Sequence, residues 1–218
     1  ARKQGLEIFS TPFDFESVDF LEKLNVNLYK IASFDLVNIP LIKYVAKTGK
    51  PMIISTGMST LGQIEDAVNA VIQEGNKNLM LLHCNSSYPA SPDEMNLKVI
   101  TNLQRMFNIP VGLSDHTMGV GASVAAVAHG AAVIEKHFTL DNSLPGPDHS
   151  ASLEPPELSQ MVESIRTVEV ALGDGNKVPQ VAELENRPVA RKSLVAACSI
   201  AQGELFSFEN LTIKRPGD

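Results

Sequence analysis

The feature that most constrains the fold is a short apolar run that recurs six times along the chain. Each run is followed by turn residues and then by a helical pattern. Runs that are apolar almost throughout, instead of alternating with polar residues, are typical of parallel strands covered on both faces. Their spacing of about 20 to 30 residues suits a repeated βα unit, so the sequence predicts six consecutive βα units. The six predicted strands are Glu7 to Thr11, Tyr29 to Ser33, Met52 to Gly57, Leu79 to Cys84, Val111 to His116 and Val133 to Phe138.

Two architectures accommodate parallel strands joined by right-handed crossovers: a doubly wound sheet and a (β/α)₈ barrel. A Gly-rich dinucleotide-binding turn does not follow the first predicted strand, which weakens the first alternative. We therefore predict an α/β fold of the TIM-barrel type. A full barrel needs eight strands and about 250 residues, whereas this chain has 218 residues. The barrel is thus expected to lack its first two βα units, and the chain to be a fragment of a longer enzyme.

Capping residues mark the predicted helices. Asn38 stands two residues before Pro40, a cap followed by a proline in the first helical turn. Thr60 and Gln63 have the spacing of a capping box at the start of the next helix. The last long amphipathic helix is predicted from Pro155 to Leu172.

The texture of the sequence changes after Gly173. Residues 174–190 are polar, contain Pro and Gly, and lack periodicity, so they are predicted to form a linker. Two short strands are expected beyond it, Ser193 to Ala197 and Leu211 to Lys214. The predicted domains are a partial barrel at 1–173, the linker at 174–190 and the beginning of a second domain at 191–218.

Charge and composition limit the classes of partner. The chain carries 18 Lys and Arg against 25 Asp and Glu, a formal net charge of −7. An acidic protein is a poor ligand for nucleic acid or an anionic membrane, and no apolar run is long enough to cross a bilayer. Its two cysteines, Cys84 and Cys198, lie in apolar stretches and suggest reduced thiols of a cytoplasmic protein, buried by simple core packing.

Polar residues occur where the apolar strands end. Because parallel strands end at one edge of a sheet or barrel, and ligands bind at that edge, these endings predict a pocket. The polar endings are Thr11, Lys30 with Ser33, Ser55 with Thr56, His83, Ser114 with Asp115 and His116, and Glu135 with His137.

Two histidines in this set are candidate metal ligands. His116 and His137 are 21 residues apart, at the ends of neighbouring predicted strands. Their imidazoles could share one divalent ion whose open positions hold water and substrate. The alternative is that each ring only makes a local hydrogen bond, but their matched positions at two strand ends favour the metal site.

The hydroxyls and the lysine indicate an anion site. A phosphate needs several donors and a compensating charge, which Lys30 could supply together with Thr11, Ser33, Ser55 and Ser114. Each hydroxyl alone could instead bond to the backbone at its strand end.

Two polar segments are predicted to form loops over the pocket. Residues 85–89 and 141–152 are too polar and too rich in Pro and Gly to be core. Tyr88 and Asp148 are candidates for contacts to a sugar or polyol. Alternatively, Tyr88 packs over the barrel rim and Asp148 caps a turn.

Seven segments of the chain together resemble the N-acetylneuraminate (sialic acid) synthase family, including its legionaminate and pseudaminate relatives. Each segment alone is weakly specific, but all seven occur in the family's order over most of the chain. They are STPFD (10–14), YKIASFD (29–35), ISTGM (54–58), CNSSYP (84–89), GLSDHT (112–117), IEKHFTLD (134–141) and GPDHSASLEP (146–155).

The resemblance implies a (β/α)₈ barrel followed by a small antifreeze-like domain. Residues 187–217 resemble the beginning of that domain. It also implies an enzyme that condenses phosphoenolpyruvate with N-acetylmannosamine or a related hexosamine, with C–O cleavage and release of phosphate. A cytoplasmic homodimer is expected. Relatives differ in the amino sugar, so legionaminate and pseudaminate synthase activities stay open.

The resemblance also assigns roles to single residues. His116 and His137 match ligands of a divalent metal, Mn²⁺ by preference, with Mg²⁺ or Co²⁺ as alternatives. The residues expected to bind the phosphate of phosphoenolpyruvate are Lys30, Thr11, Ser33, Ser55 and Ser114. Those expected to bind the acceptor sugar are Tyr88, Asp148, Phe13 and Ser86. Glu135 could orient a water or move its proton, and Asp35, which stands where many relatives have Glu, is a candidate acid or base.

Two rival functions remain at this point. One keeps the barrel but changes the reaction to another metal-assisted aldolase or lyase chemistry. The other is a sugar-binding or ice-binding interaction module without activity, which has no need of paired histidines at strand ends.

Overall fold

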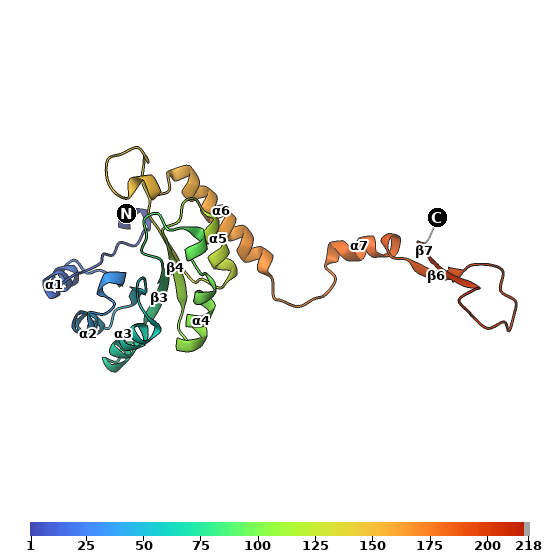
Figure 1. The fold of residues 1–218 in the computed structure, drawn as a ribbon, viewed down its shortest axis with the longest axis horizontal. Helices are drawn as coiled ribbons and strands as arrows, with labels where there is room; N and C mark the ends of the chain where they lie inside the picture. Colours follow the sequence, from blue (N-terminus) through green and yellow to red (C-terminus); the bar gives the residue numbers. More distant parts are fainter. Residues whose placement is uncertain (216–218) are drawn as a thin grey trace. The chain divides into compact units, whose positions relative to one another are not determined.

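The computed structural model describes residues 1–215, and the chain divides into two compact units, Ala1–Leu172 and a second that begins at Gly173. The first unit is built on a parallel five-stranded sheet in the order β1-β2-β3-β4-β5 (Figure 1). Each strand pairs with the next one along the chain, without the reversal of order that defines a doubly wound sheet. The strands are β1 (Tyr29–Ile31), β2 (Met52–Ser55), β3 (Leu79–Cys84), β4 (Val111–Asp115) and β5 (Ile134–Lys136).

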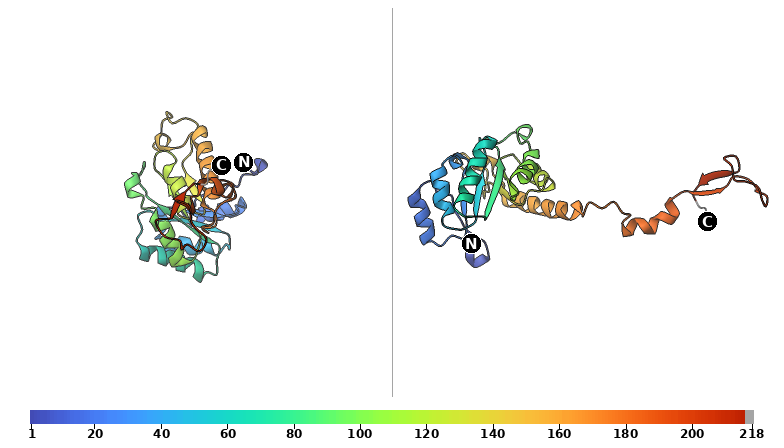
Figure 2. Two further views of the ribbon diagram at one scale, coloured as in Figure 1. Left: turned by 90° about the vertical axis from the view of Figure 1, so that its right-hand side faces the viewer. Right: turned by 90° about the horizontal axis from the view of Figure 1, so that it is seen from below.

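Helices lie around these strands in the views of Figure 1 and Figure 2. The predicted caps are confirmed, since the side chain of Asn38 accepts a hydrogen bond from the backbone of Leu41, and Thr60 forms the capping box with Gln63. The helix predicted from Pro155 to Leu172 is also present. The α-helices are α1 (Phe15–Lys23), α2 (Ile39–Ala46), α3 (Leu61–Gln73), α4 (Lys98–Phe107), α5 (Gly121–Ala128) and α6 (Pro155–Leu172), and the 3₁₀ turns are η1 (Arg2–Gln4), η2 (Ser33–Asp35), η3 (Pro92–Glu94) and η4 (His149–Ala151).

The first predicted strand, Glu7 to Thr11, is wrong. The segment is extended, but only one backbone hydrogen bond joins it to β1, from the amide of Lys30 to the carbonyl of Ser10 at 3.4 Å. Its apolar side chains Ile8 and Phe9 stay 50% and 40% exposed. An apolar pattern alone does not make a strand where the ladder of backbone hydrogen bonds is not formed.

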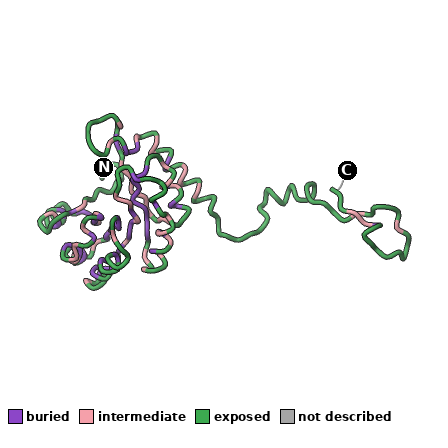
Figure 3. The backbone as a smooth tube through the Cα atoms, viewed as in Figure 1, coloured by how far each residue is buried: buried purple, intermediate pink, exposed green. Residues whose placement is uncertain are grey.

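The hydrophobic core of the first unit lies between the strands and the helices. Buried residues are concentrated in the strands and in the helix faces that cover them, while the chain beyond α6 is mostly exposed (Figure 3). The largest fully buried side chains of this core come from the strands, from α2 and α4, and from the segments that lead into these helices: Tyr29, Ile31, Leu36, Leu41, Ile42, Met52, Ile54, Leu81, Met95, Ile100 and Leu113.

The second unit contains α7 (Val181–Ala190) and the antiparallel pair β6 (Ser193–Ala196) and β7 (Leu211–Lys214). The two predicted strands are confirmed. The predicted linker at 174–190 contains a helix that was not expected, because its Pro188 and polar composition hide the capping box that Gln180 forms with Glu183. The part of the predicted second domain at 216–218 lies outside the described residues.

None of the helices in residues 1–215 is both long enough and apolar enough to cross a bilayer.

The Glu22 carboxylate, bonded to the buried Tyr29, makes the stability of the first unit depend on pH. The Tyr29 hydroxyl donates to the Glu22 carboxylate at 2.6 Å, and Lys50 Nζ lies 2.6 Å from the same oxygen. Burial alone would raise the pKa of Glu22, but the hydrogen bonds from Lys50 and Tyr29 outweigh it and hold this pKa below its ordinary value.

Glu22→Gln is therefore expected to lower the melting temperature at neutral pH. The stabilisation is fully present above the unfolded-state pKa of about 4.3 and is lost as the pH falls through the lower folded-state pKa. Thermal unfolding of the full-length protein at a series of pH values measures this difference, with Glu65→Gln on the exposed side of α3 as the control. A difference that stays constant down to pH 3 would contradict the assignment.

Candidate active site

A cavity of about 100 Å³ opens where the parallel strands end. Its wall contains residues from all five strands or from the turns directly after them. The lining residues are Lys30, Ala32, Ser33, Phe34, Ser55, Cys84, Tyr88, Ser114, His116, Glu135 and His137.

The alternation of side chains along β4 and β5 explains which residues reach the cavity. Ser114 pairs with Glu135 across the two strands, and both line the cavity together with His116 and His137. The intervening residues are absent from its wall, as expected when successive side chains point to opposite faces of a strand.

The two candidate metal ligands lie next to each other. The ring centroids of His116 and His137 are 5.2 Å apart, at an angle of 70°. The ring of Tyr88 lies 4.1 Å from His116 and 5.6 Å from His137, so it covers both imidazoles.

Hydrogen bonding sets the tautomer of His116. Its Nδ1 lies 2.7 Å from the carbonyl oxygen of Asn85, and because a carbonyl only accepts, Nδ1 must carry the proton. The lone pair is then on Nε2, as a metal ligand requires. On the other ring, Nδ1 of His137 lies 3.8 Å from Oδ2 of Asp148.

This donor set fits a divalent ion held by two imidazoles. Across residues 1–215, no group of three or more His, Cys, Asp or Glu side chains is arranged to hold a metal. Water and substrate oxygens would therefore have to complete the coordination, which suits a Lewis-acid site with open positions.

The opposite part of the cavity is suited to an anion. Lys30 is only 7% exposed, and its Nζ lies 3.4 Å from Oε2 of Glu135 and 3.3 Å from the carbonyl of Ile31. Within the described residues, the buried Ser55 Oγ has no hydrogen-bond partner. An unpaired buried hydroxyl costs about 1–3 kcal/mol, so a ligand oxygen that pairs with it is favoured.

The other two serine hydroxyls of the cavity already have partners. Ser114 Oγ donates to Oε1 of Glu135 at 2.6 Å, and the backbone N–H of Gly57 donates to Ser33 Oγ at 3.0 Å. A Cβ at Gly57 would collide with the Oγ atoms of Ser33 and Ser86, so this position allows two loops to approach closely.

Sequence reasoning missed Cys84 as a member of this site. Its thiol lies 3.9 Å from Nδ1 of His116 and 3.9 Å from Oγ of Ser86. Burial would raise the pKa of the thiol, but hydrogen bonds to His116, Ser33 and Ser114 outweigh this and lower it. Burial would lower the pKa of His116, but its contacts with Cys84 and with the Asn85 carbonyl, and the charge of Glu135, outweigh this and raise it. The pairing of Cys84 with Ser114 between β3 and β4 places it here, and this register is not evident from the sequence.

Five predicted site residues lie outside the wall of this cavity. Thr11 is half-buried in the extended segment, and Phe13 is 61% exposed. Asp35, in η2, accepts a hydrogen bond from Nδ2 of Asn38 at 3.4 Å. Asp148 approaches the cavity only through His137. Ser86 lines a neighbouring hollow of about 350 Å³ that shares Cys84 with the cavity.

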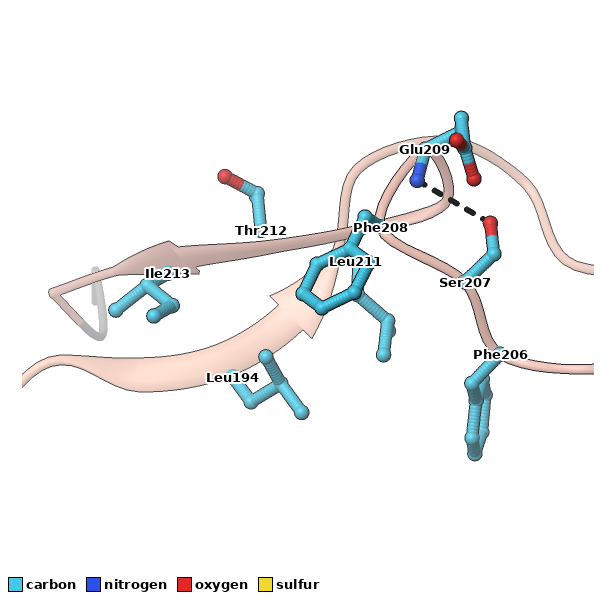
Figure 4. A pocket seen from close by; sticks show the side chains of 8 residues that line it. All are labelled: Leu194, Phe206, Ser207, Phe208, Glu209, Leu211, Thr212 and Ile213. Carbon is cyan, nitrogen blue, oxygen red and sulfur yellow. Dashed lines mark hydrogen bonds between the residues drawn. The ribbon is translucent and has the colours of Figure 1, made fainter.

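A larger hollow of about 560 Å³ lies on the β6–β7 hairpin (Figure 4). Its lining is mainly apolar, and its one ionisable side chain is Glu209. Such a surface lacks the convergent polar groups of a catalytic site. The lining residues are Leu194, Phe206, Ser207, Phe208, Glu209, Leu211, Thr212 and Ile213.

The fold and this polar cavity agree with a family match. The NeuB family model matches residues 1–177, and the chain belongs to the NeuB family. It is 50% identical to N,N'-diacetyllegionaminic acid synthase from Campylobacter jejuni, over 100% of this chain and 66% of that protein. It is 41% identical to N-acetylneuraminate-9-phosphate synthase from Homo sapiens, over 98% of this chain and 60% of that protein. The chain spans 60–66% of the length of the curated relatives it matches.

Solved structures give the same picture of the fold. The N-acetylneuraminic acid (sialic acid) synthetase of Leptospira borgpetersenii, crystallised with citrate, superposes with a TM-score of 0.80 at 38% identity, over 85% of this chain and 65% of that one. A DAHP synthase from Thermotoga maritima superposes with a TM-score of 0.72 at 16% identity, over 79% of this chain and 53% of that one, a likeness of fold alone. Both neighbours are TIM barrels, and the first unit is a curled parallel half-barrel of five strands, which is consistent with an incomplete barrel.

Proposed function

We propose that the full-length protein containing this chain is a nonulosonic acid synthase that condenses phosphoenolpyruvate with an N-acetylated hexosamine. One observation carries the proposal: a buried ammonium and an unpaired buried hydroxyl share one small cavity with two adjacent imidazoles. The names of the relatives support the same class of reaction. The hexosamine is N-acetylmannosamine or a diacetamido relative, which makes sialic acid, legionaminate and pseudaminate synthesis the three candidate activities.

The reaction joins two carbon atoms and releases phosphate. C3 of phosphoenolpyruvate forms a bond to the aldehyde carbon of the open-chain sugar, whose oxygen takes up a proton. Water adds at C2, and the bond between C2 and the phosphate oxygen then breaks with its electron pair going to phosphate. Lys30 neutralises the phosphate, and Ser33 and Ser55 donate to it. Thr11 and Ser114 are further predicted donors, and Ser114 would have to turn its proton from Glu135 to the phosphate.

Glu135 is suited to proton transfer at C2. Its carboxylate is oriented by Ser114 Oγ at 2.6 Å and by Lys30 Nζ at 3.4 Å, and its side chain stays 40% exposed. A carboxylate held in this way can accept the proton of the water that adds at C2 and return it to the leaving phosphate. Asp35 remains the second predicted acid or base.

His116 and His137 would hold the divalent ion, Mn²⁺ by preference, with Mg²⁺ and Co²⁺ as alternatives. Bound there, such an ion supplies Lewis acidity toward the aldehyde oxygen. Tyr88 and Asp148, together with the predicted residues Phe13 and Ser86, would orient the sugar. A cytoplasmic homodimer with an antifreeze-like domain completes the proposal.

The test supplies the full-length protein with phosphoenolpyruvate, Mn²⁺ and a panel of acceptors: N-acetylmannosamine, its 6-phosphate and diacetamido hexoses. We expect phosphate release with one acceptor and a product whose mass is that of the matching nonulosonic acid. Phosphoenolpyruvate labelled with ¹⁸O at the bridging position should transfer the label to phosphate, as C–O cleavage requires.

Absence of phosphate release with every acceptor would contradict the proposal. Turnover of a free 2-oxo acid in place of phosphoenolpyruvate would favour the aldolase or lyase alternative. Sugar binding without turnover would favour the interaction module.

A further inference from the structure

A buried ion pair lies beside both candidate metal ligands without facing the cavity. Lys136 Nζ is 2.9 Å from Oδ2 of Asp115, and the two side chains are 3% and 0% exposed. Asp115 immediately precedes His116, and Lys136 immediately precedes His137. Neither side chain lines the cavity, so the pair lies on the opposite face of β4 and β5 from the imidazoles.

The pair is the centre of a fully bonded network. Both the amide and the hydroxyl of Thr117 donate to Oδ1 of Asp115 at 2.8 Å, and Ser123 of α5 donates to Oδ2 at 2.6 Å. Lys136 Nζ also donates to the carbonyl of Thr117 at 2.5 Å. The residues on both sides of His116 are thus bonded to the neighbour of His137.

The backbone alone holds these two strand ends weakly. β5 has only three residues, all half-buried, and its register with β4 covers three residue pairs. The pair Asp115–Lys136 is the last of them, directly before the imidazoles. A short ladder of this kind leaves the ends free to shift unless side chains fix them.

Stability alone does not explain a buried charge pair at this point. Desolvation of two charges cancels most of their attraction, and apolar replacements of both partners are often neutral or stabilising. The network can instead fix the geometry of the two histidines. Groups that contact metal ligands without binding the metal commonly set the orientation of those ligands and the affinity for the metal.

We infer that Asp115 and Lys136 are positioning residues that set the spacing and angle of the His116 and His137 imidazoles for a divalent ion. The inference rests on the proposed function, since it takes the imidazole pair as the metal site. Both residues act through the backbone of the ligands, and neither touches the ion or the substrate.

The experiment compares Mn²⁺ binding to the full-length wild-type protein and to two variants, by calorimetry at a temperature where each is folded. Lys136→Met removes the cation, and Asp115→Asn combined with Lys136→Met removes both charges, so that no unpaired carboxylate is left buried. Lys50→Met is the matched control, because it breaks the Lys50–Glu22 pair far along the sheet from β5.

We expect the affinity for Mn²⁺ to fall about 10- to 100-fold in both variants. The Mn²⁺ concentration for half-maximal activity should rise by the same factor, while kcat at saturating Mn²⁺ and the affinity for phosphoenolpyruvate without metal stay near the wild-type values. A merely structural pair would lower the melting temperature and leave these metal constants unchanged.

Unchanged Mn²⁺ affinity in a folded variant would overturn the positioning role while leaving the proposed function intact. Failure of the wild-type protein to bind Mn²⁺ would contradict both. If neither Lys136 variant folds, Ser123→Ala decides the question, because it removes one donor to Asp115 and keeps the ion pair. Its Mn²⁺ affinity should fall at least about threefold, as expected for one lost hydrogen bond, and an unchanged value would refute the role.

Discussion

Replacing His116 by alanine is expected to abolish Mn²⁺ binding and to lower kcat/KM of the full-length protein by about 10³ or more, since a bound metal supplies several kcal/mol of transition-state stabilisation. Of the two candidate metal ligands, the substitution removes the ring whose tautomer is fixed by a carbonyl, the Asn85 oxygen at 2.7 Å from Nδ1. It leaves the fold intact, because Asn85 is only half-buried and its carbonyl can turn to water.

Calorimetric Mn²⁺ titration and initial rates measure the two parts of this effect. His129→Ala is the matched control, since His129 is an exposed residue at the end of α5. His116→Ala protein with a wild-type rate and wild-type Mn²⁺ stoichiometry would refute the metal assignment.

Replacing Lys30 by methionine is expected to lower kcat/KM for phosphoenolpyruvate by about 10²- to 10³-fold, a loss of about 3–4 kcal/mol for a buried, charge-assisted contact to a phosphate. Methionine keeps most of the volume of the buried stem. The partner carboxylate of Glu135 keeps its hydrogen bond from Ser114 and is 40% exposed, so the substitution does not strand a buried charge.

The substitution of Lys30 should change KM for phosphoenolpyruvate and not the dissociation constant for Mn²⁺. We expect KM for phosphoenolpyruvate to rise and the Mn²⁺ affinity to stay unchanged, the reverse of the pattern for Lys136→Met. Lys43→Met, on α2 with Nζ 3.4 Å from the Gln73 side chain, is the control for loss of a surface lysine. An unaltered KM in the Lys30 variant would place the phosphate elsewhere.

The strand-end argument succeeded for residues on the cavity-facing side of the paired strands, but Thr56, His83 and Asp115, predicted at the same edge, do not line the cavity. Parallel strands share one direction, so knowing that Lys30, Ser55 and Glu135 end strands was enough to predict that they meet around one cavity. The argument failed for the segment 7–11, because its apolar character was taken to mean that it pairs as a strand. It does not form a strand, and Thr11 lies outside the cavity wall.

Loop and core residues were harder to predict for three different reasons. Asp35 is held by its hydrogen bond to Asn38, a local contact that no strand pattern encodes. Cys84 sits in an apolar run in which a core thiol and a thiol beside an imidazole have the same sequence context. The Asp115–Lys136 pair depends on the register of two strands, which periodicity does not give.

The sequential order of the strands also bears on how such a protein can diverge. Each βα unit contributes its own loop to a common mouth, and the loop between β3 and α4 carries Tyr88 and Ser86 without carrying Lys30 or either histidine. Under the proposed function, replacements of Tyr88 and Ser86 are expected to change which sugar fits while Lys30 and Ser55, which lie on β1 and β2, keep the phosphate site; Asn85, in the same loop, has to stay because its carbonyl accepts from His116. We therefore expect acceptor preference and phosphate binding to be separate targets for natural selection and for protein engineering.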